Sequence, residues 1–327
     1  MADAAVQPLL DIRGLTVEFA VDGGGSLRAV DNVSLQLAAG STLGLVGESG
    51  CGKTVTAMSI PRLIPQPPGR IVGGEIRLQG QELLRLPIRE LRQIRGRDIG
   101  VIFQEPMTAL SPLRRIGDQL AEVVLLHRPV SRREALDLGL EWLEKVGIPD
   151  PRQRMDAFPF ELSGGMRQRV MIAMAMMLQP CLVIADEPTT ALDVTIQAQI
   201  LDLLRAIRSH EAGLLLITHD MGVIWEMCER MAVMYASRLV ECGPVKEIFA
   251  EPLHPYTIGL MRSIPALHDG KGRLAHIPGQ VPSLAALPPG CAFADRCEHA
   301  MPICRRERPE LLGNANGRQV ACHLHRG

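Results

Sequence analysis

The sequence predicts an α/β protein with a helical subdomain and a small C-terminal module. Short apolar strands alternate with helical segments along much of the chain, a pattern typical of a largely parallel sheet covered by helices. Charged residues interleaved with leucine and valine between Ser111 and Val146 predict the helical subdomain. Beyond Gly243-Pro244 prolines recur so often that long helices are excluded. The 46% apolar content of the 327 residues is sufficient for one large core and a smaller appendage.

The elements can be assigned in chain order from apolar runs and the turn residues beside them. Three glycines at 23–25 separate the first strands from an apolar segment that ends at Val46. Ser131 and Glu134 have the spacing of a capping box, which predicts a helix start there. The predicted strands are 9–12, 15–19, 43–46, 99–103, 182–185 and 214–218, and the predicted helices that follow the subdomain are 165–178 and 195–209.

Composition limits the classes of partner. The formal net charge is -1 and the isoelectric point is near 6.8, so there is no general basic field and no nucleic-acid partner is expected. The apolar stretch from Val170 to Ala185 is divided by Gln179-Pro180 and is shorter than the roughly 20 residues that span a bilayer. We expect a buried helix followed by a buried strand. The N-terminus shows no basic leader before an apolar segment, so a cytoplasmic location is expected.

A glycine-rich segment between an apolar strand and a helical run matches the phosphate-binding loop pattern. Glycines let backbone N–H groups converge on phosphate oxygens, and the following helix adds its positive N-terminal end. Lys53 is expected to reach the β and γ phosphates of a nucleotide, and the Thr54 hydroxyl to ligate Mg²⁺. A glycine-rich turn with a chance lysine is the alternative, and the flanking strand and helix disfavour it. The segment consists of Gly47, Glu48, Ser49, Gly50, Cys51, Gly52, Lys53 and Thr54.

Two adjacent carboxylates, Asp186 and Glu187, end the apolar strand that begins near Leu182. The carboxyl ends of parallel strands are where such sheets position ligands. Asp186 is expected to contact Mg²⁺ through water, and Glu187 to orient and deprotonate the attacking water as general base. A helix cap at the strand exit would explain Asp186 alone, but it explains the pair poorly.

The segment 162–168 reads LSGGMRQ and resembles the signature sequence of ABC ATPases. Three further residues occur in the order of that family: Gln104 after the strand 99–103, Asp193 in an Ala-Leu-Asp triplet, and His219 in an Ile-Thr-His-Asp stretch. The resemblance spans about residues 9 to 245. It implies an ABC nucleotide-binding domain of the P-loop, RecA-like class, with ATP and Mg²⁺ as its ligands.

The same resemblance implies a head-to-tail pair of nucleotide-binding domains, in which each ATP lies between one phosphate loop and the partner's signature. The Ser163 hydroxyl and the amides of Gly164 and Gly165 would donate to the γ-phosphate held by the partner, at a helix start with a favourable dipole. One chain therefore supplies half of each ATP site.

Further roles follow from the family's pattern. His219 would hold the γ-phosphate and Glu187 in register, and Asp193 would shape the seam of the pair. Gln104 would sense Mg²⁺ and the attacking water while its loop touches the membrane subunit. The implied catalytic residues are thus Glu187, His219 and Gln104.

Two positions need comment. Met166 replaces the glutamine that usually follows the second glycine of the signature, a difference that we associate with the peptide and nickel branch of the family. Phe19 is assigned by position as the aromatic residue that stacks on adenine, and a buried strand phenylalanine is the competing interpretation.

Four of the eight cysteines lie near the C-terminus, in a proline-rich segment with few large apolar side chains. Because such a segment can bury little apolar surface, it needs a cross-link such as a bound metal or disulfides. Four thiolates suit either a tetrahedral zinc ion or an iron–sulfur cluster. Their spacing does not choose between the two. Three arginines among them are expected to form a solvated basic face, and compensation of the charge of a bound cluster is the alternative. The cysteines are Cys291, Cys297, Cys304 and Cys322, and the arginines are Arg296, Arg305 and Arg306.

The stretch 253–257, the Ile277-Pro278-Gly279 turn and the segment 289–291 resemble the C-terminal extension of oligopeptide and dipeptide transporter ATPases. In that family the four cysteines can hold a [4Fe-4S] cluster. The resemblance therefore implies a structural [4Fe-4S] cluster, with Zn²⁺, free thiols or disulfides as the alternatives.

Taken together, these features predict the ATP-binding and hydrolysing subunit of an ABC importer for di- and oligopeptides. The nucleotide-binding domain is predicted at 1–250, with the helical subdomain at about 106–166 and the extension at 251–327. The expected partners are a second homologous ATPase subunit, two transmembrane permease subunits and an extracytoplasmic solute-binding protein, with this chain on the cytoplasmic face of the membrane. Nickel, glutathione or oligosaccharide cargo, or a soluble ABC ATPase acting on DNA or the ribosome, are the alternatives.

Overall fold

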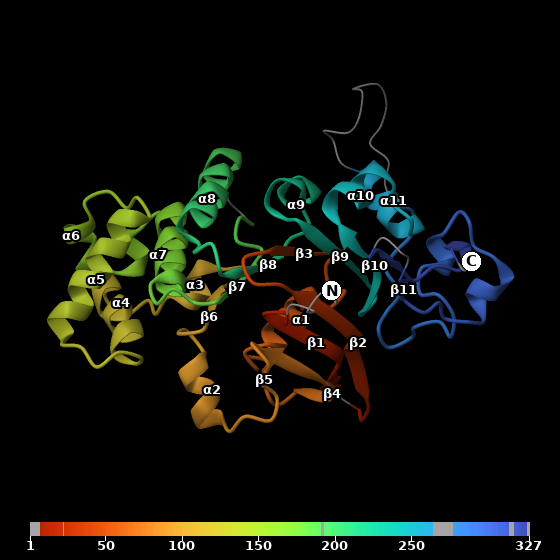
Figure 1. Cartoon of the computed structure of the whole chain (residues 1–327), viewed down its shortest axis with the longest axis horizontal. Coiled ribbons are helices and arrows are strands. Elements are labelled where there is room, and N and C mark those ends of the chain that lie inside the picture. The colour runs from red at the N-terminus through yellow and green to blue at the C-terminus, as the bar shows by residue number, and fades with distance from the viewer. Residues whose placement is uncertain (1–6, 22, 191–192, 264–276, 314–316, 326–327) are drawn as a thin grey trace, which may run out of the picture. The chain divides into compact units, whose positions relative to one another are not determined.

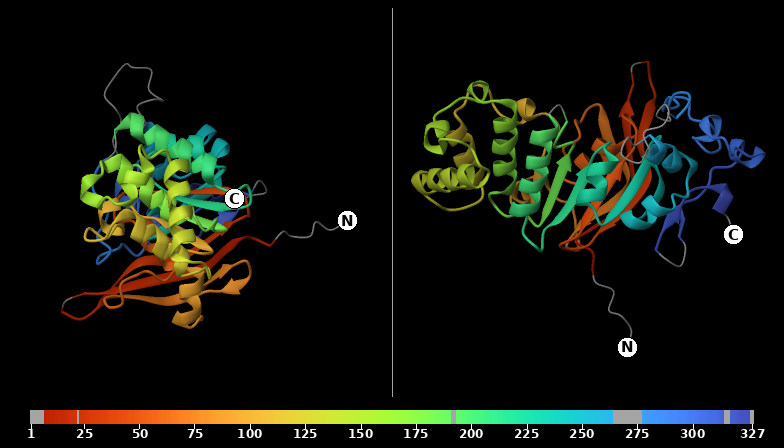
Figure 2. Two further views of the ribbon diagram at one scale, coloured as in Figure 1. Left: turned by 90° about the vertical axis from the view of Figure 1, so that its left-hand side faces the viewer. Right: turned by 90° about the horizontal axis from the view of Figure 1, so that it is seen from above.

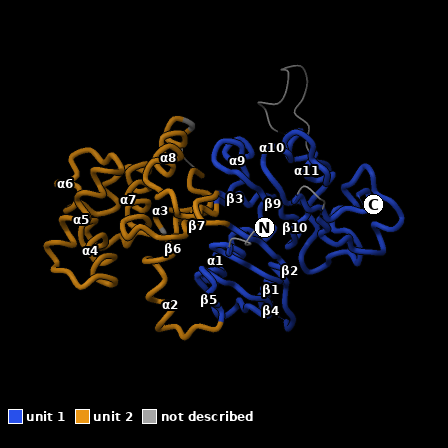
Figure 3. Tube along the Cα trace, in the orientation of Figure 1, with its two compact units in different colours: residues 1–37, 42–84, 216–327 blue, residues 38–41, 85–215 orange. Residues whose placement is uncertain are grey.

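The structure is a computed structural model that describes residues 7–21, 23–190, 193–263, 277–313 and 317–325. Ala191 and Leu192, which precede Asp193 in its predicted motif, lie outside the described residues. Contacts between Cα atoms divide the chain into two compact units, shown in different colours in Figure 3. Unit 1 comprises residues 1–37, 42–84 and 216–327, and unit 2 comprises residues 38–41 and 85–215.

Unit 1 contains an antiparallel sheet with the strand order β2-β1-β4-β5 (Figure 1). The sequence predicted two short strands at 9–12 and 15–19, but β1 is one continuous strand. Its pairing with β2 shifts register between Ile12 and Leu15, where Gly14 has a φ of 59°, so a β-bulge accounts for the apparent break. The strands are β1 (Leu10–Ala20), β2 (Ser26–Leu37), β4 (Gly69–Leu78) and β5 (Gln81–Glu82).

Unit 1 also contains strands in the order β11-β12-β10-β9-β3. The strands β3 and β9 are parallel, and every residue of β3 is buried, which explains its uninterrupted apolar sequence. The antiparallel strands β9 and β10 were not predicted. The elements are β3 (Thr42–Val46), α1 (Lys53–Ser59), α9 (Met221–Met227), β9 (Arg230–Tyr235), β10 (Arg238–Pro244), α10 (Val245–Ala250), α11 (Pro255–Arg262), β11 (Leu312–Gly313) and β12 (Gln319–Val320).

The C-terminal segment packs on β10, as the blue region beside α10 and α11 in Figure 2 shows. The helix α11 has eight residues and the other described helices after Pro244 are shorter, as the prolines predict. At the centre lies Glu241, whose fully buried carboxylate accepts from Leu253 N at 3.0 Å, His254 N at 2.9 Å and Arg318 Nη2 at 2.9 Å. The short 3₁₀ turns are η3 (Ala294–Arg296), η4 (Pro302–Arg305) and η5 (His323–His325).

Unit 2 combines parallel strands with a group of packed helices, α4 to α7. The capping box is confirmed, because Ser131 Oγ accepts from Glu134 N at 3.3 Å and Glu134 Oε2 accepts from Ser131 N at 2.7 Å. The predicted strand at 182–185 and the helices at 165–178 and 195–209 are confirmed to within a few residues as β7, α7 and α8. The elements are α2 (Ile88–Ile94), β6 (Ile99–Ile102), α3 (Pro106–Ala109), α4 (Ile116–Leu125), α5 (Arg132–Lys145), α6 (Pro151–Met155), η1 (Pro159–Glu161), α7 (Gly164–Met176), β7 (Leu182–Asp186) and α8 (Val194–Ile207). The strand β8 (Gly213–Ile217) begins in unit 2, and its last two residues belong to unit 1.

The buried residue His254 makes the stability of unit 1 depend on pH. Its Nδ1 accepts from Tyr256 N at 3.0 Å and caps α11, and burial lowers the pKa of His254 to about 3. In the unfolded chain the imidazole returns to its usual pKa of 6.5 and binds a proton that the folded chain does not. The free energy of unfolding therefore falls as the pH falls from 6.5 towards 3, by up to about 1.4 kcal/mol per pH unit.

Replacing His254 by Asn should make the acid side of the stability curve shallower, since Asn keeps an acceptor at the cap but does not titrate. The measurement is the melting temperature of both proteins between pH 7 and 4.5. His210→Asn, at an exposed histidine of unit 2, should leave the wild-type slope unchanged. Parallel curves for wild type and His254→Asn would contradict the prediction.

Candidate functional site

The predicted phosphate-binding loop joins β3 to α1 in unit 1. The helix α1 begins at Lys53, whose side chain is buried. Lys53 Nζ donates to Gly47 O at 2.8 Å and to Glu48 O at 3.1 Å, so the ammonium group lies within the turn of the loop. Ser49 and Gly50 of the loop and Thr54 in the first turn of α1 are exposed. This strand–loop–helix arrangement is the structural context that a phosphate-binding loop requires.

Two glycines allow the loop to approach neighbouring backbone closely. Gly47 has a φ of 153°, and a Cβ there would lie 2.2 Å from Met234 O of β9. Gly52 has a φ of 105°, and a Cβ there would lie 2.2 Å from Ala29 O of β2. Both distances are far below van der Waals contact, so only glycine fits. The loop path is therefore set by the strands behind it.

The acidic strand end lies in unit 2, where β6 and β7 run parallel and end at the same edge. Asp186 is the last residue of β7 and is buried. Glu187 follows with a φ of 46°, a left-handed conformation that costs a non-glycine residue about 1–3 kcal/mol and that clusters at functional sites. Glu187 Oε2 accepts from Gln104 Nε2 at 3.2 Å and from Thr190 Oγ1 at 2.9 Å. The structure thus brings Gln104 and Glu187 together.

The signature segment forms the start of α7 in unit 2. Ser163 is the N-cap residue and its Oγ accepts from Met166 N at 3.3 Å, while Gly164 and Gly165 form the first turn. The first N–H groups of a helix have no intrahelical acceptor and point outward along its axis, which suits an anion. One turn later, Gln168 Nε2 donates to Pro188 O at 2.6 Å and connects α7 to the residue after Glu187.

The remaining predicted residues also lie at element ends or in strands. His219 is exposed in the turn between β8 and α9, and the Asp220 carboxylate beside it caps α9 by accepting from Gly222 N at 2.7 Å. Asp193 caps α8 by accepting from Ile196 N at 2.9 Å. Phe19 is half-buried in β1, opposite Gly69 of β4.

The four C-terminal cysteines line one small cavity of unit 1. Burial raises the pKa of Cys291 to about 11, and the other three thiols add to the shift. Burial also raises the pKa of Cys297 and of Cys322, so the thiol form is favoured at neutral pH. Within the part of the chain that the structure describes, no group of three or more His, Cys, Asp or Glu residues is placed so that it could hold a metal ion. The cysteines are gathered, but they do not have the geometry of a metal centre.

The prediction of a solvated basic face is wrong for Arg296. Its side chain is 7% exposed, and its guanidinium binds the Glu48 carboxylate in the phosphate-binding loop. Arg305 is 63% exposed and pairs with Asp295, and Arg306 is also exposed, as predicted. The sequence carries no signal for the contact of Arg296, because 248 residues separate it from Glu48.

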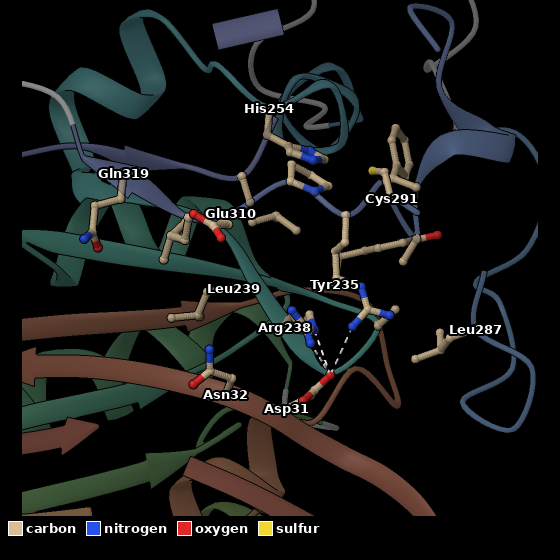
Figure 4. Close-up of a pocket in the computed structure, with 18 of the residues that line it drawn as sticks. Asp31, Asn32, Tyr235, Arg238, Leu239, His254, Leu287, Cys291, Glu310 and Gln319 are labelled. Atoms are coloured by element: carbon tan, nitrogen blue, oxygen red, sulfur yellow. Dashed lines mark hydrogen bonds and ion pairs between the residues drawn. The ribbon is translucent and has the colours of Figure 1, made fainter. Parts of the chain in front are cut away.

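A cavity of about 540 Å³ lies beside β10 and the C-terminal segment (Figure 4). At its wall the buried Asp31 accepts from Arg238 Nε at 2.8 Å and pairs with Arg308 at 3.4 Å. None of the residues of the phosphate-binding loop lines this cavity. It is therefore separate from the phosphate-binding loop.

A glycine loop between a buried strand and a helix, an acidic strand end and a serine-capped glycine helix define a nucleotide-binding protein of the P-loop ATPase class. The family model described as ABC transporter matches residues 30–190, and that of the oligopeptide/dipeptide transporter C-terminal region matches residues 240–304. A "Putative peptide import ATP-binding protein" of Brucella melitensis biotype 1 is 51% identical over 317 residues, which cover 93% of this chain and 94% of that protein.

Two further comparisons agree. A "Probable peptide ABC transporter ATP-binding protein" of Sinorhizobium fredii is 50% identical, with 96% of this chain and 94% of that protein covered. A solved dimeric ATP-binding cassette, in a post-hydrolysis state bound to ADP and Pi, is 25% identical with a TM-score of 0.65, and the match covers 72% of this chain and 98% of that one. The chain belongs to the family of ABC transporter ATP-binding proteins and is an ABC ATPase.

The comparisons favour none of the alternative functions that the sequence left open. Among the described residues, no helix combines the length and the apolar character that are needed to cross a membrane.

Replacing Gly47 by Ala should destabilise unit 1 and weaken ATP binding, because the new Cβ would lie 2.2 Å from the backbone carbonyl oxygen of Met234. We expect a loss of several kcal/mol, above the roughly 1–3 kcal/mol of a strained backbone alone. The measurements are thermal unfolding and the affinity for a fluorescent ATP analogue. Gly23→Ala is the control, since Gly23 also has a positive φ of 94° but no atom within 4 Å of its Cβ position. Equal effects of the two changes would refute the steric argument.

Proposed function

We propose that this chain is the ATP-binding and hydrolysing subunit of an ABC importer that energises the uptake of di- and oligopeptides. The observation that carries the proposal is that one chain holds both a phosphate-binding loop and a match to the oligopeptide/dipeptide transporter C-terminal region at residues 240–304. The names of the relatives from Brucella and Sinorhizobium, which refer to peptide import or a peptide transporter, support the cargo.

The partners follow from this proposal. A second homologous ATPase subunit would pair head-to-tail with this chain, as the dimeric form of the solved cassette suggests. Two transmembrane permease subunits would form the pathway, and an extracytoplasmic solute-binding protein would deliver the peptide. The chain would lie at the cytoplasmic face of the membrane. We propose that its nucleotide-binding domain comprises residues 1–250, including a helical subdomain at about 106–166, and that the extension comprises residues 251–327.

In the nucleotide site, we assign Lys53 and the amides of the loop from Gly47 to Gly52 to the β and γ phosphates. Thr54 and Asp186 would hold Mg²⁺, which withdraws charge from the phosphates when bound. Phe19 would stack on adenine. Its side chain in β1 is half-buried, so part of it remains accessible.

Hydrolysis requires a water molecule that attacks the γ-phosphorus while the bond to the β–γ bridging oxygen breaks and ADP leaves. Glu187 would take the proton of this water, held in orientation by Gln104 and Thr190. His219 would keep the γ-phosphate in register with Glu187. The Ser163 hydroxyl and the amides of Gly164 and Gly165 would act on the ATP held by the partner subunit.

Replacing Glu187 by Gln should leave ATP affinity near the wild-type value and reduce the turnover number at least about 100-fold, because the amide cannot accept the proton. ATPase activity of the assembled transporter is the measurement. Glu144→Gln, at an exposed glutamate of α5, should retain full turnover. Normal turnover of Glu187→Gln would show that another residue is the base.

The cargo is tested with the transporter reconstituted in proteoliposomes. Di- and oligopeptides presented by the solute-binding protein should stimulate ATP hydrolysis and accumulate inside the vesicles. Stimulation by nickel, glutathione or oligosaccharides, and not by peptides, would overturn the peptide assignment while leaving the ATPase assignment intact.

We also propose that Cys291, Cys297, Cys304 and Cys322 bind a structural [4Fe-4S] cluster after local rearrangement. Their common cavity supports the proposal, whereas their present arrangement does not. Iron–sulfur clusters require thiolates, so binding must displace protons from the buried thiols.

Iron and sulfide should be present after anaerobic purification of the full chain, and Cys291→Ser should lose them. Cys181→Ser, at a cysteine of unit 2 outside the cavity, should retain the iron. Zinc in place of iron would support the alternative of a zinc site. Absence of both metals from the wild-type protein would leave the four cysteines as free or disulfide-paired thiols.

A further inference from the structure

The C-terminal segment reaches the phosphate-binding loop at Glu48. Arg296 Nη1 donates to Glu48 Oε2 at 2.8 Å and Arg296 Nη2 donates to Glu48 Oε1 at 3.0 Å, which makes the pair bidentate. The backbone N–H of Glu48 donates to the Tyr256 hydroxyl at 2.8 Å. Both the side chain and the backbone of this loop residue are therefore held by residues more than 200 positions later in the chain.

Arg296 is itself held in place. Its Nε donates to Pro278 O at 2.8 Å, and its Nη1 donates to the Tyr235 hydroxyl at 3.3 Å. The guanidinium also lies 5.7 Å from the ring centroids of Tyr235 and Phe293. These contacts hold the guanidinium in its orientation independently of Glu48. The Arg296 side chain therefore loses little further conformational freedom when it binds Glu48.

Glu48 connects this contact to the lysine of the loop. Its carbonyl oxygen accepts from Lys53 Nζ at 3.1 Å, while its carboxylate and N–H are bound from outside the loop. Any movement of Glu48 would shift an acceptor of Lys53. A loop whose path is held in this way loses less conformational freedom when it closes on phosphate, which favours binding.

We infer that Arg296 is a positioning residue of the nucleotide site, which acts through Glu48 to keep the phosphate-binding loop in the conformation that binds ATP. The C-terminal segment is then part of the ATP site and does not serve only the four cysteines. The inference rests on ATP binding by the loop and is independent of the transported cargo.

The test is a double-mutant cycle on the full chain, with Arg296→Gln, Glu48→Gln and the double variant. The readouts are the dissociation constant for a fluorescent ATP analogue and, in the assembled transporter, KM for ATP and kcat. We expect each single change to weaken ATP binding about ten-fold, because one charge of the pair is left uncompensated. The double variant should bind ATP at least as tightly as whichever single variant binds it less tightly. KM should rise with little change in kcat, since no reacting group is altered.

Arg305→Gln is the matched control. It makes the same substitution in the same segment and breaks an ion pair, with Asp295, that does not involve the loop. Its ATP affinity should equal that of the wild type. Arg296→Lys should recover part of the affinity, because lysine retains the charge without the fork.

Wild-type ATP affinity in folded Arg296→Gln and Glu48→Gln would overturn the inference, and so would additive losses in the double variant. If Arg296→Gln does not fold, Glu48→Gln decides alone, because Glu48 is 27% exposed and its isosteric replacement keeps the packing of the segment. Failure of ATP binding by the wild type itself would instead refute the function of the loop, so the two failures are distinguishable.

Discussion

The close approach of the phosphate-binding loop to the backbone of β9 is the constraint on which unit 1 depends. The carbonyl of Met234 occupies the space where any side chain at residue 47 would begin. The next residue, Tyr235, packs on Tyr256 at a centroid distance of 4.6 Å and contacts Arg296. A single strand thus supports the loop from behind and carries Tyr235, which contacts Tyr256 and Phe293 of the C-terminal segment.

In unit 2 a hydrogen bond joins the acidic strand end to the signature helix α7. Glu187 is held in a strained conformation with Gln104 and Thr190 on its carboxylate, and Gln168 of α7 binds the carbonyl of Pro188. In the proposed dimer, Glu187 and Ser163 serve different ATP molecules. The hydrogen bond from Gln168 to Pro188 therefore links the residues proposed for the two sites within one unit.

Hydrogen bonds to a buried carboxylate help to attach the C-terminal segment to β10. Glu241 is a carboxylate with no exposed surface, and it is satisfied by two backbone N–H groups and by Arg318. A buried charge is tolerated only when its lone pairs are used in this way, and breaking such a pair costs about 3–5 kcal/mol. Hydrogen bonds and aromatic packing thus tie this proline-rich segment to the rest of unit 1.

The sequence by itself determined the features whose physical causes are local. The capping box of Ser131 and the elements β7 and α7 depend on residues a few positions apart, because helix hydrogen bonds and turn conformations close over three or four residues. Tertiary structure decided the rest. The bulge that makes β1 continuous, the pairing of β9 with β10, and the burial of Arg296 against Glu48 depend on partners brought from distant positions, and composition and spacing carry no record of that pairing.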